Sequence, residues 1–234
     1  MQTDMTVGKP MKMLLNFTIP VFLGKCFSTC CYSMADAVIV GKFVGTKGLA
    51  AVGATGTITF LIIGFLMGVT TGVTVLTSQK FGAGRMDEMR KTVGNAAILS
   101  AVIAVVMTAV SMLGMHRLLV FMHTPEDIFD GAYGYIMIIC AGIFTQVLYN
   151  LVSSILRALG NSKTPLYFLI LAAGLNIVLD LVFIIFFHWG APGAAWATVI
   201  SQGVSGVLCL IYMWKAVPEL KMKKKTGILT VILP

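Results

Sequence analysis

Apolar residues in this chain gather into six long runs that are separated by short polar or glycine-rich segments. A helix needs about 20 mostly apolar residues to cross the hydrocarbon core of a bilayer, and each run has at least that length. The pattern therefore predicts six membrane-spanning α-helices joined by short connections. Their expected ranges are 13–40, 49–78, 93–115, 132–156, 166–187 and 194–214.

The composition supports a membrane protein and leaves little chain for a separate soluble domain. Of the 234 residues, 58% are hydrophobic and 11% are charged, whereas a soluble domain carries about 25% charged residues. These charges are too few to cover a surface that faces water, so lipid is the expected solvent. We therefore expect an all-α integral membrane protein.

The basic residues indicate how the helices are oriented. Of the 17 lysines and arginines, Lys25 lies inside a run; among the other 16, thirteen fall on the side that holds both chain ends and three on the opposite side. The positive-inside bias places the richer side in the cytoplasm, so both termini are expected there. Because the charges lie between apolar runs, the net charge of +8 does not indicate a nucleic-acid partner.

Small residues within the runs predict close contacts between helices. Gly64, Gly68 and Gly72 form a ridge at four-residue spacing in the second run, which favours close packing. The five cysteines also lie within apolar runs, and none belongs to a Cys/His pattern with zinc-ligand spacing. The chain has no HExxH motif, and its three histidines lie in connections. We expect neither an enzyme nor a cofactor.

Three charged side chains lie well inside the apolar runs: Lys25, Asp36 and Asp180. A charge in the bilayer costs roughly 2.5–3.5 kcal/mol on insertion scales, so such residues generally serve a function. At 1.5 Å per residue, Asp36 lies roughly 9 Å and Asp180 roughly 12 Å below the outer boundary. Thr198 in the sixth run lies roughly 10 Å below the same boundary. The two acids and this hydroxyl share one depth, as they must if they meet.

Neighbours on the same helix faces add further oxygen atoms at this depth. Asn176 lies four residues before Asp180, and Tyr32 lies four residues before Asp36, so each pair shares a face. Oxygen ligands suit a small hard cation, and burial beside a second acid favours the protonated form of a carboxyl group. The set is therefore a candidate site for a cation or a proton. The alternative is that each aspartate only hydrogen-bonds between helices.

Two residues of the first run are candidates for supporting roles. Lys25 lies eleven residues before Asp36, close to three helical turns, so it shares that face about 16 Å away. It either lines a cavity or extends toward the cytoplasm, and the sequence leaves both alternatives open. Pro20 removes a backbone hydrogen bond within the run, which predicts a kink and makes it a candidate hinge.

Four pieces of the chain together carry a family resemblance, and their order and spacing cover essentially its whole length. The pieces are ADAVIVGK (35–42) with GLAAVG (48–53), RALGNSKTP (157–165), NIVLD (176–180) and GAAWAT (193–198). They resemble the MATE multidrug and toxin extrusion transporters, which implies a fold of two six-helix lobes related by an axis along the membrane normal. This chain is then expected to be one lobe, the N-terminal half of a 12-helix transporter.

The resemblance also implies a function and assigns roles to residues. Family members export cationic and amphipathic compounds in exchange for Na⁺ or H⁺, so we expect such an antiporter in a bacterial cytoplasmic (inner) membrane. The implied cation-binding residues are Asp36, Asn176, Asp180 and Thr198, with the backbone carbonyl of Ala194. The residues that resemble neighbours of this site or of the substrate cavity are Tyr32, Tyr135 and Asn150, with Lys25 as a further candidate.

The chain departs from the family in length. The family has about twelve helices in two lobes, and this sequence predicts six between a short segment at 1–12 and a basic linker at 215–234. The end of that linker, Gly227–Pro234, resembles the truncated start of a seventh helix. The expected partners are therefore a small-molecule substrate, membrane lipid, and either a C-terminal lobe or a second copy of this chain. Lys25 also stands where the family pattern has an uncharged polar residue.

Two other functions remain open at this stage. One is a flippase for lipid-linked oligosaccharides in the same superfamily, but such a protein needs a wide cationic cavity, and the runs here hold two acids and one base. The other is a truncated membrane protein that transports nothing, because alternating access requires two bundles that move around a shared site.

Overall fold

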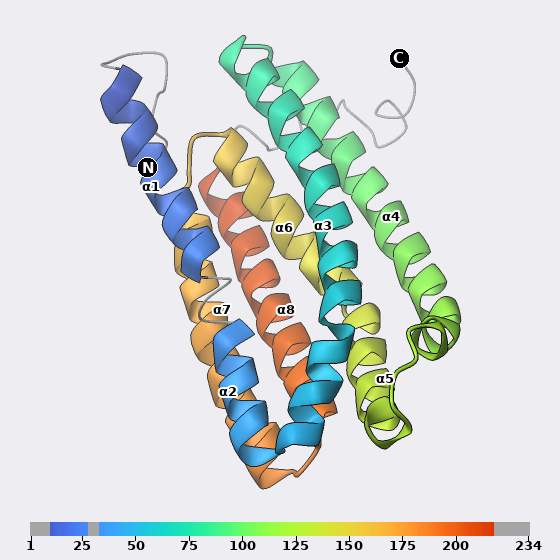
Figure 1. Cartoon of the computed structure of the whole chain (residues 1–234). Helices are drawn as coiled ribbons and strands as arrows, with labels where there is room; N and C mark the ends of the chain where they lie inside the picture. Colours follow the sequence, from blue (N-terminus) through green and yellow to red (C-terminus); the bar gives the residue numbers. More distant parts are fainter. Residues whose placement is uncertain (1–9, 28–32, 218–234) are drawn as a thin grey trace.

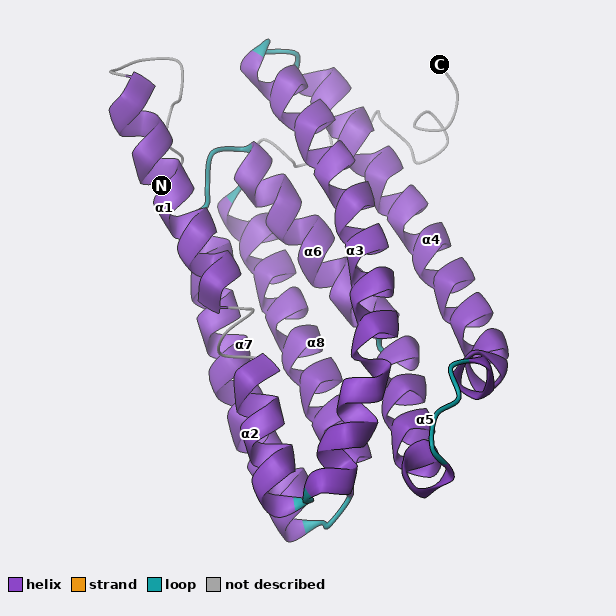
Figure 2. Ribbon diagram, viewed as in Figure 1, coloured by secondary structure: helices purple, strands orange, loops and turns teal. Residues whose placement is uncertain are grey.

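The computed structural model describes residues 10–27 and 33–217. Over these ranges the chain is a bundle of α-helices without a β-strand (Figure 2), which confirms the predicted all-α class. The helices are α1 (Pro10–Phe27), α2 (Ser33–Phe43), α3 (Thr46–Gly82), α4 (Met86–Phe121), α5 (Glu126–Ala141), α6 (Ile143–Ala158), α7 (Lys163–Leu181) and α8 (Gly190–Ala216), with a π-helical segment η2 (Val182–Phe186) after α7.

Five membrane spans can be identified among the described residues. The helices α3, α4, α7 with η2, and α8 are each long and apolar enough to cross a bilayer, and α5 with α6 forms a fifth, bent span. The remaining expected span, 13–40, corresponds to α1 and α2, whose connection at 28–32 lies outside the described residues. The predicted number of six is therefore approximate.

The helices α3 and α4 are longer than the apolar runs predict. Their 37 and 36 residues correspond to about 55 Å each, whereas the hydrocarbon core is about 30 Å thick. Polar residues extend both helices beyond the apolar part, to a turn at 83–85 that ion pairs hold together. Those pairs are Lys80–Glu88 and Arg85–Glu88, and a further pair, Arg90–Asp87, lies within α4.

The span formed by α5 and α6 bends by 46° at Gly142, where the sequence predicts one straight helix. A Cβ atom on Gly142 would lie 2.2 Å from Cγ2 of Val199, so the absence of a side chain is what lets α8 approach. Two threonine hydroxyls donate to backbone carbonyls at the bend. Thr108 donates to Cys140 O (3.4 Å), and Thr145 donates to Gly142 O (2.8 Å).

The helix α8 lies at the centre of the bundle, where it packs against α5, α6 and α7 (Figure 1). Small residues permit this packing, since a Cβ on Gly203 or Gly206 would lie 3.3 Å from atoms of α6. In contrast, α1 packs mainly against α7, with Gly24 beside Leu166 and Leu169. The central helix therefore connects most of the bundle.

Large apolar side chains cover much of the outer surface. Phe60, Leu113 and Phe186 are 76%, 84% and 81% exposed, as expected for groups that face lipid. The glycine ridge of α3 (Gly64, Gly68 and Gly72) also faces outward, and a Cβ on each would have no atom within 4 Å. The predicted packing of this ridge is therefore wrong for the described part of the chain.

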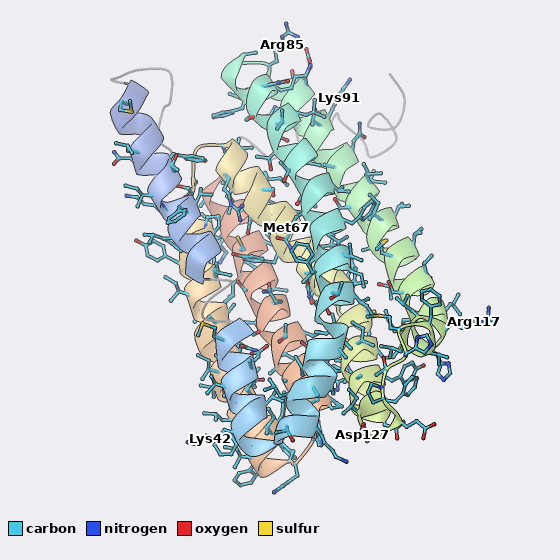
Figure 3. All side chains as sticks on the ribbon, viewed as in Figure 1. Lys42, Met67, Arg85, Lys91, Arg117 and Asp127 are labelled. Atoms are coloured by element: carbon cyan, nitrogen blue, oxygen red, sulfur yellow. The ribbon has the colours of Figure 1, made fainter. Side chains whose placement is uncertain are left out.

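The two ends of the bundle carry different charged residues (Figure 3). Arg85 and Lys91 lie at the end formed by the α3–α4 turn, which we call the basic end. Lys42 and Asp127 lie at the opposite end, where Lys47 and Asp127 form an ion pair of 3.7 Å.

Candidate cation site

Three helices carry the four side chains that are predicted to bind a cation. Asp36 lies in α2, Asn176 and Asp180 lie in α7, and Thr198 lies in α8. Asp36, Asp180 and Thr198 lie about two helical turns from the end of the bundle that carries Lys42, and Asn176 lies one turn deeper. Asp36, Asn176 and Asp180 are buried, and Thr198 is half-buried.

A short chain of hydrogen bonds links these helices. The Thr198 hydroxyl donates to Oδ2 of Asp36, and Nδ2 of Asn176 donates to the Thr198 hydroxyl, each over 3.4 Å. Both distances are long for such bonds, so they are weak. Thr198 is the link that joins α2 to α7 through α8.

Four buried oxygen atoms at this junction have no hydrogen-bond partner among the described residues. They are Oδ1 of Asp36, Oδ1 of Asn176, and both carboxyl oxygens of Asp180. Buried polar atoms are costly without a partner, and buried carboxylates are more costly still. A hard cation takes oxygen ligands of this kind, and a proton on either acid would supply a donor. These oxygen atoms therefore suit either a small monovalent cation or a proton.

Two other predicted residues lie close to this group. Tyr135 of α5 is buried, and its phenol lies near Asp36 and Asp180. Ala194 is fully buried in α8, one turn before Thr198. The structure thus places a phenol and a backbone carbonyl at the depth of the acids.

The other predicted residues differ in what the structure describes of them. Asn150 donates instead to Gln146 O within α6, over 2.8 Å. Tyr32 and the side chain of Lys25 lie outside the described residues. Pro20 lies inside α1, which continues on both sides of it, so the predicted hinge stays a prediction.

The helix that carries Asp180 changes its geometry one residue further on, after Leu181. The next residues, Val182–Phe186, form the π-helical segment η2, in which Phe187 N donates to Val182 O over 3.1 Å. Such π-turns occur frequently at functional sites. No proline or glycine in this stretch could have indicated it.

Sequence reasoning also missed residues between the acidic group and the basic end. The sequence predicts Arg157 in a connection, but it is half-buried in the last turn of α6. Ser201, Ser205 and Cys209 are fully buried on α8. Their spacing of three or four residues from Thr198 onward was the signal that could have revealed them.

Comparison with known proteins identifies relatives for most of the chain. The family model MatE matches residues 20–182. "Probable multidrug resistance protein YpnP" of Bacillus subtilis (strain 168) is 32% identical over 212 residues, which are 91% of this chain and 47% of the relative. The "FAD transporter" of Shewanella oneidensis is 27% identical over 86% of this chain and 46% of the relative.

The fold is also found among solved structures. The outward-facing conformation of a multidrug resistance MATE family transporter of the MOP superfamily superimposes with a TM-score of 0.87 and 28% identity. That match covers 97% of this chain and 51% of the solved chain. This chain therefore spans about half the length of the relatives that it matches.

Proposed function

Because this chain belongs to the MatE family, we propose that it is the N-terminal, cation-binding half of a secondary antiporter. The complete transporter exports cationic or amphipathic drugs and toxins in exchange for Na⁺ or H⁺. The names of the relatives support this proposal, since they include multidrug resistance proteins. Relatives are transporters rather than enzymes, and the chain is a multi-pass membrane protein.

The observation that carries the proposal is the set of four buried, unpartnered oxygens on Asp36, Asn176 and Asp180. A site whose only function was to join helices would pair these atoms, because an unpaired buried acceptor destabilises the fold. A bound cation or proton gives these oxygen atoms a partner, and its release leaves them buried and unpaired again. The site can therefore alternate between two states of similar free energy, as ion coupling requires.

The exchange follows from competition between ion and substrate. Asp36 and Asp180 take up the ion from the outside, and Thr198 transmits the change between α2, α7 and α8 through its two hydrogen bonds. The altered bundle releases the substrate outward. The ion must leave toward the cytoplasm before a new substrate binds. Bending of the first span near Pro20 remains part of this proposal.

Transport by rocking needs a second bundle. We propose that a C-terminal lobe or a second copy of this chain supplies it, because the relatives are about twice as long. The transporter lies in a bacterial cytoplasmic membrane. The basic end of the bundle and both termini face the cytoplasm, in accord with the distribution of lysine and arginine.

The test is an acid-to-amide substitution in the complete native polypeptide. Asp36→Asn should abolish drug export from cells that lack other exporters, with the protein level in the membrane unchanged. Asp130→Asn, at an exposed acid of α5, is the matched control and should export normally. Full export by Asp36→Asn would refute the proposal. Reconstitution with either a Na⁺ or a pH gradient then identifies the ion that drives uptake.

A further inference from the structure

A row of buried polar side chains leads from the candidate site toward the basic end. On α8, Ser201, Ser205 and Cys209 follow Thr198 on one helix face, and all three are 0% exposed. Ser201 donates to Thr198 O over 3.0 Å. A hydroxyl or thiol thus occurs on every turn of this face below Thr198.

Polar groups on α6 continue the row. Ser153 is 0% exposed and lies beside Tyr149 and Cys209. Tyr149 donates to Pro165 O (3.0 Å), and Ser205 donates to Phe168 O (2.9 Å), so both contact α7. The row therefore occupies the space where α6, α7 and α8 meet, in the half of the bundle nearest the basic end.

Arg157 lies at the end of this row, one turn after Ser153. Its guanidinium group lies near the side chains of Tyr149 and Cys209. The described residues offer it no acidic partner, since their ion pairs all involve other basic residues. Figure 1 shows that α6 ends at the same end of the bundle as the α3–α4 turn. A fixed positive charge thus terminates a polar path that starts at two acids.

We propose that Arg157 is an electrostatic barrier that keeps the coupling ion from leaking to the cytoplasm while the acidic site is open to the outside. The inference rests on the proposed antiport and adds a residue to it. Buried hydroxyls are better surroundings for a cation or proton than hydrocarbon is, so the row is the path of lowest cost across the inner half. A fixed cation at its mouth repels passing cations, as arginine does in selective pores. Coupling requires such a barrier, because an open path would dissipate the gradient.

A structural role for Arg157 is the competing explanation. An arginine in the last turn of a helix interacts favourably with the helix dipole, and serines also serve as small residues at helix contacts. Loss of a structural residue lowers the amount of folded protein and lowers transport. Loss of a barrier raises the ion flux that occurs without substrate. The passive flux therefore separates the two explanations.

The experiment uses the complete native polypeptide in liposomes, without drug, and records passive H⁺ and Na⁺ entry under an imposed membrane potential. Arg157→Gln should raise the entry of the coupling ion about tenfold or more, because a unit charge acts strongly in a low dielectric. Arg157→Lys should retain the wild-type rate. Lys163→Gln removes an exposed charge at the same end and should change nothing. If Arg157→Gln does not fold, Arg157→Met also removes the charge and replaces it in the comparison of passive ion entry.

The double variant Asp36→Asn/Arg157→Gln shows whether the leak passes through the acidic site. The leak should fall back to the wild-type rate. An unchanged passive flux in Arg157→Gln and Arg157→Met, with export lost in Asp36→Asn, would overturn the barrier while the proposed antiport stands. Normal export by Asp36→Asn would instead overturn the antiport proposal, whatever the leak.

Discussion

The close approach of Gly142 to Val199 gives the sharpest prediction. Gly142 has φ −81° and ψ 1°, a conformation open to any residue, so the need for glycine is steric. In Gly142→Ala the new Cβ would lie 2.2 Å from Cγ2 and 2.9 Å from Cγ1 of Val199. Carbon atoms pack at about 3.5–4.0 Å, so α6 and α8 must separate by more than about 1 Å.

The expected cost follows from this overlap. A β-branched side chain in a helix has one strongly preferred rotamer, so Val199 cannot rotate away cheaply. Overpacking a core costs about 1–3 kcal/mol, and two simultaneous overlaps place Gly142→Ala near the upper value. Thr198 directly precedes Val199, and its hydrogen bonds to Asp36 and Asn176 are already 3.4 Å long. Export should therefore fall further than the amount of folded protein.

A double-mutant cycle checks the reasoning. Unfolding in detergent is compared for the wild type, Gly142→Ala, Val199→Ala and the double variant, and drug export is measured in parallel. Because Val199→Ala removes both overlapping methyl groups, the double variant should be more stable than the sum of the single effects by at least about 1 kcal/mol. Additive effects would refute the steric account. Gly174→Ala, at an exposed glycine with open space around it, should be neutral.

Three further outcomes are expected in the complete polypeptide. Gly68→Leu should impair assembly or export if the glycine ridge meets a second bundle. Gly114→Leu, also exposed on a helix with open space, should have no effect. Equal effects of the two substitutions would show that the ridge does not contact a second bundle. Thr198→Val should reduce ion-driven export severalfold, and Thr198→Ser should retain it. Normal export by Thr198→Val would exclude a role for the hydroxyl in coupling. Arg85→Cys should react with a membrane-impermeant maleimide only in inverted vesicles and Asp127→Cys only in intact cells, while the reverse pattern would invert the proposed orientation.

Sequence patterns predicted the parts of this molecule that depend on local composition. Apolar runs of sufficient length predicted the spans, and counting residues from their ends placed Asp36, Asp180 and Thr198 at one depth. The structure adds that these three side chains meet, because Asp36 contacts both Thr198 and Asp180. Depth alone could not have shown this, because residues at one level can still face different directions around the bundle.

The missed features depend on contacts between distant segments. The bend at Gly142 arises because Val199, 57 positions later in the sequence, occupies the space of its missing side chain. Hydropathy reports only the apolar run, so it predicted one straight helix there. The turn residues Gly160 and Asn161 predict a loop around Arg157, and only the packing of α6 against α8 shows that it is half-buried.

The long helices α3 and α4 have a practical consequence for imaging a protein that is small and mostly embedded in detergent. Both continue without a break to the turn at 83–85, and the ion pair between Lys80 and Glu88 connects them near that turn. A compact soluble protein spliced between Ala83 and Gly84 would be carried on two rigid helical supports, well away from Asp36 and Asp180. It would act as an alignment marker for electron cryomicroscopy, and images of loaded and unloaded transporter could then be sorted by the position of the marker.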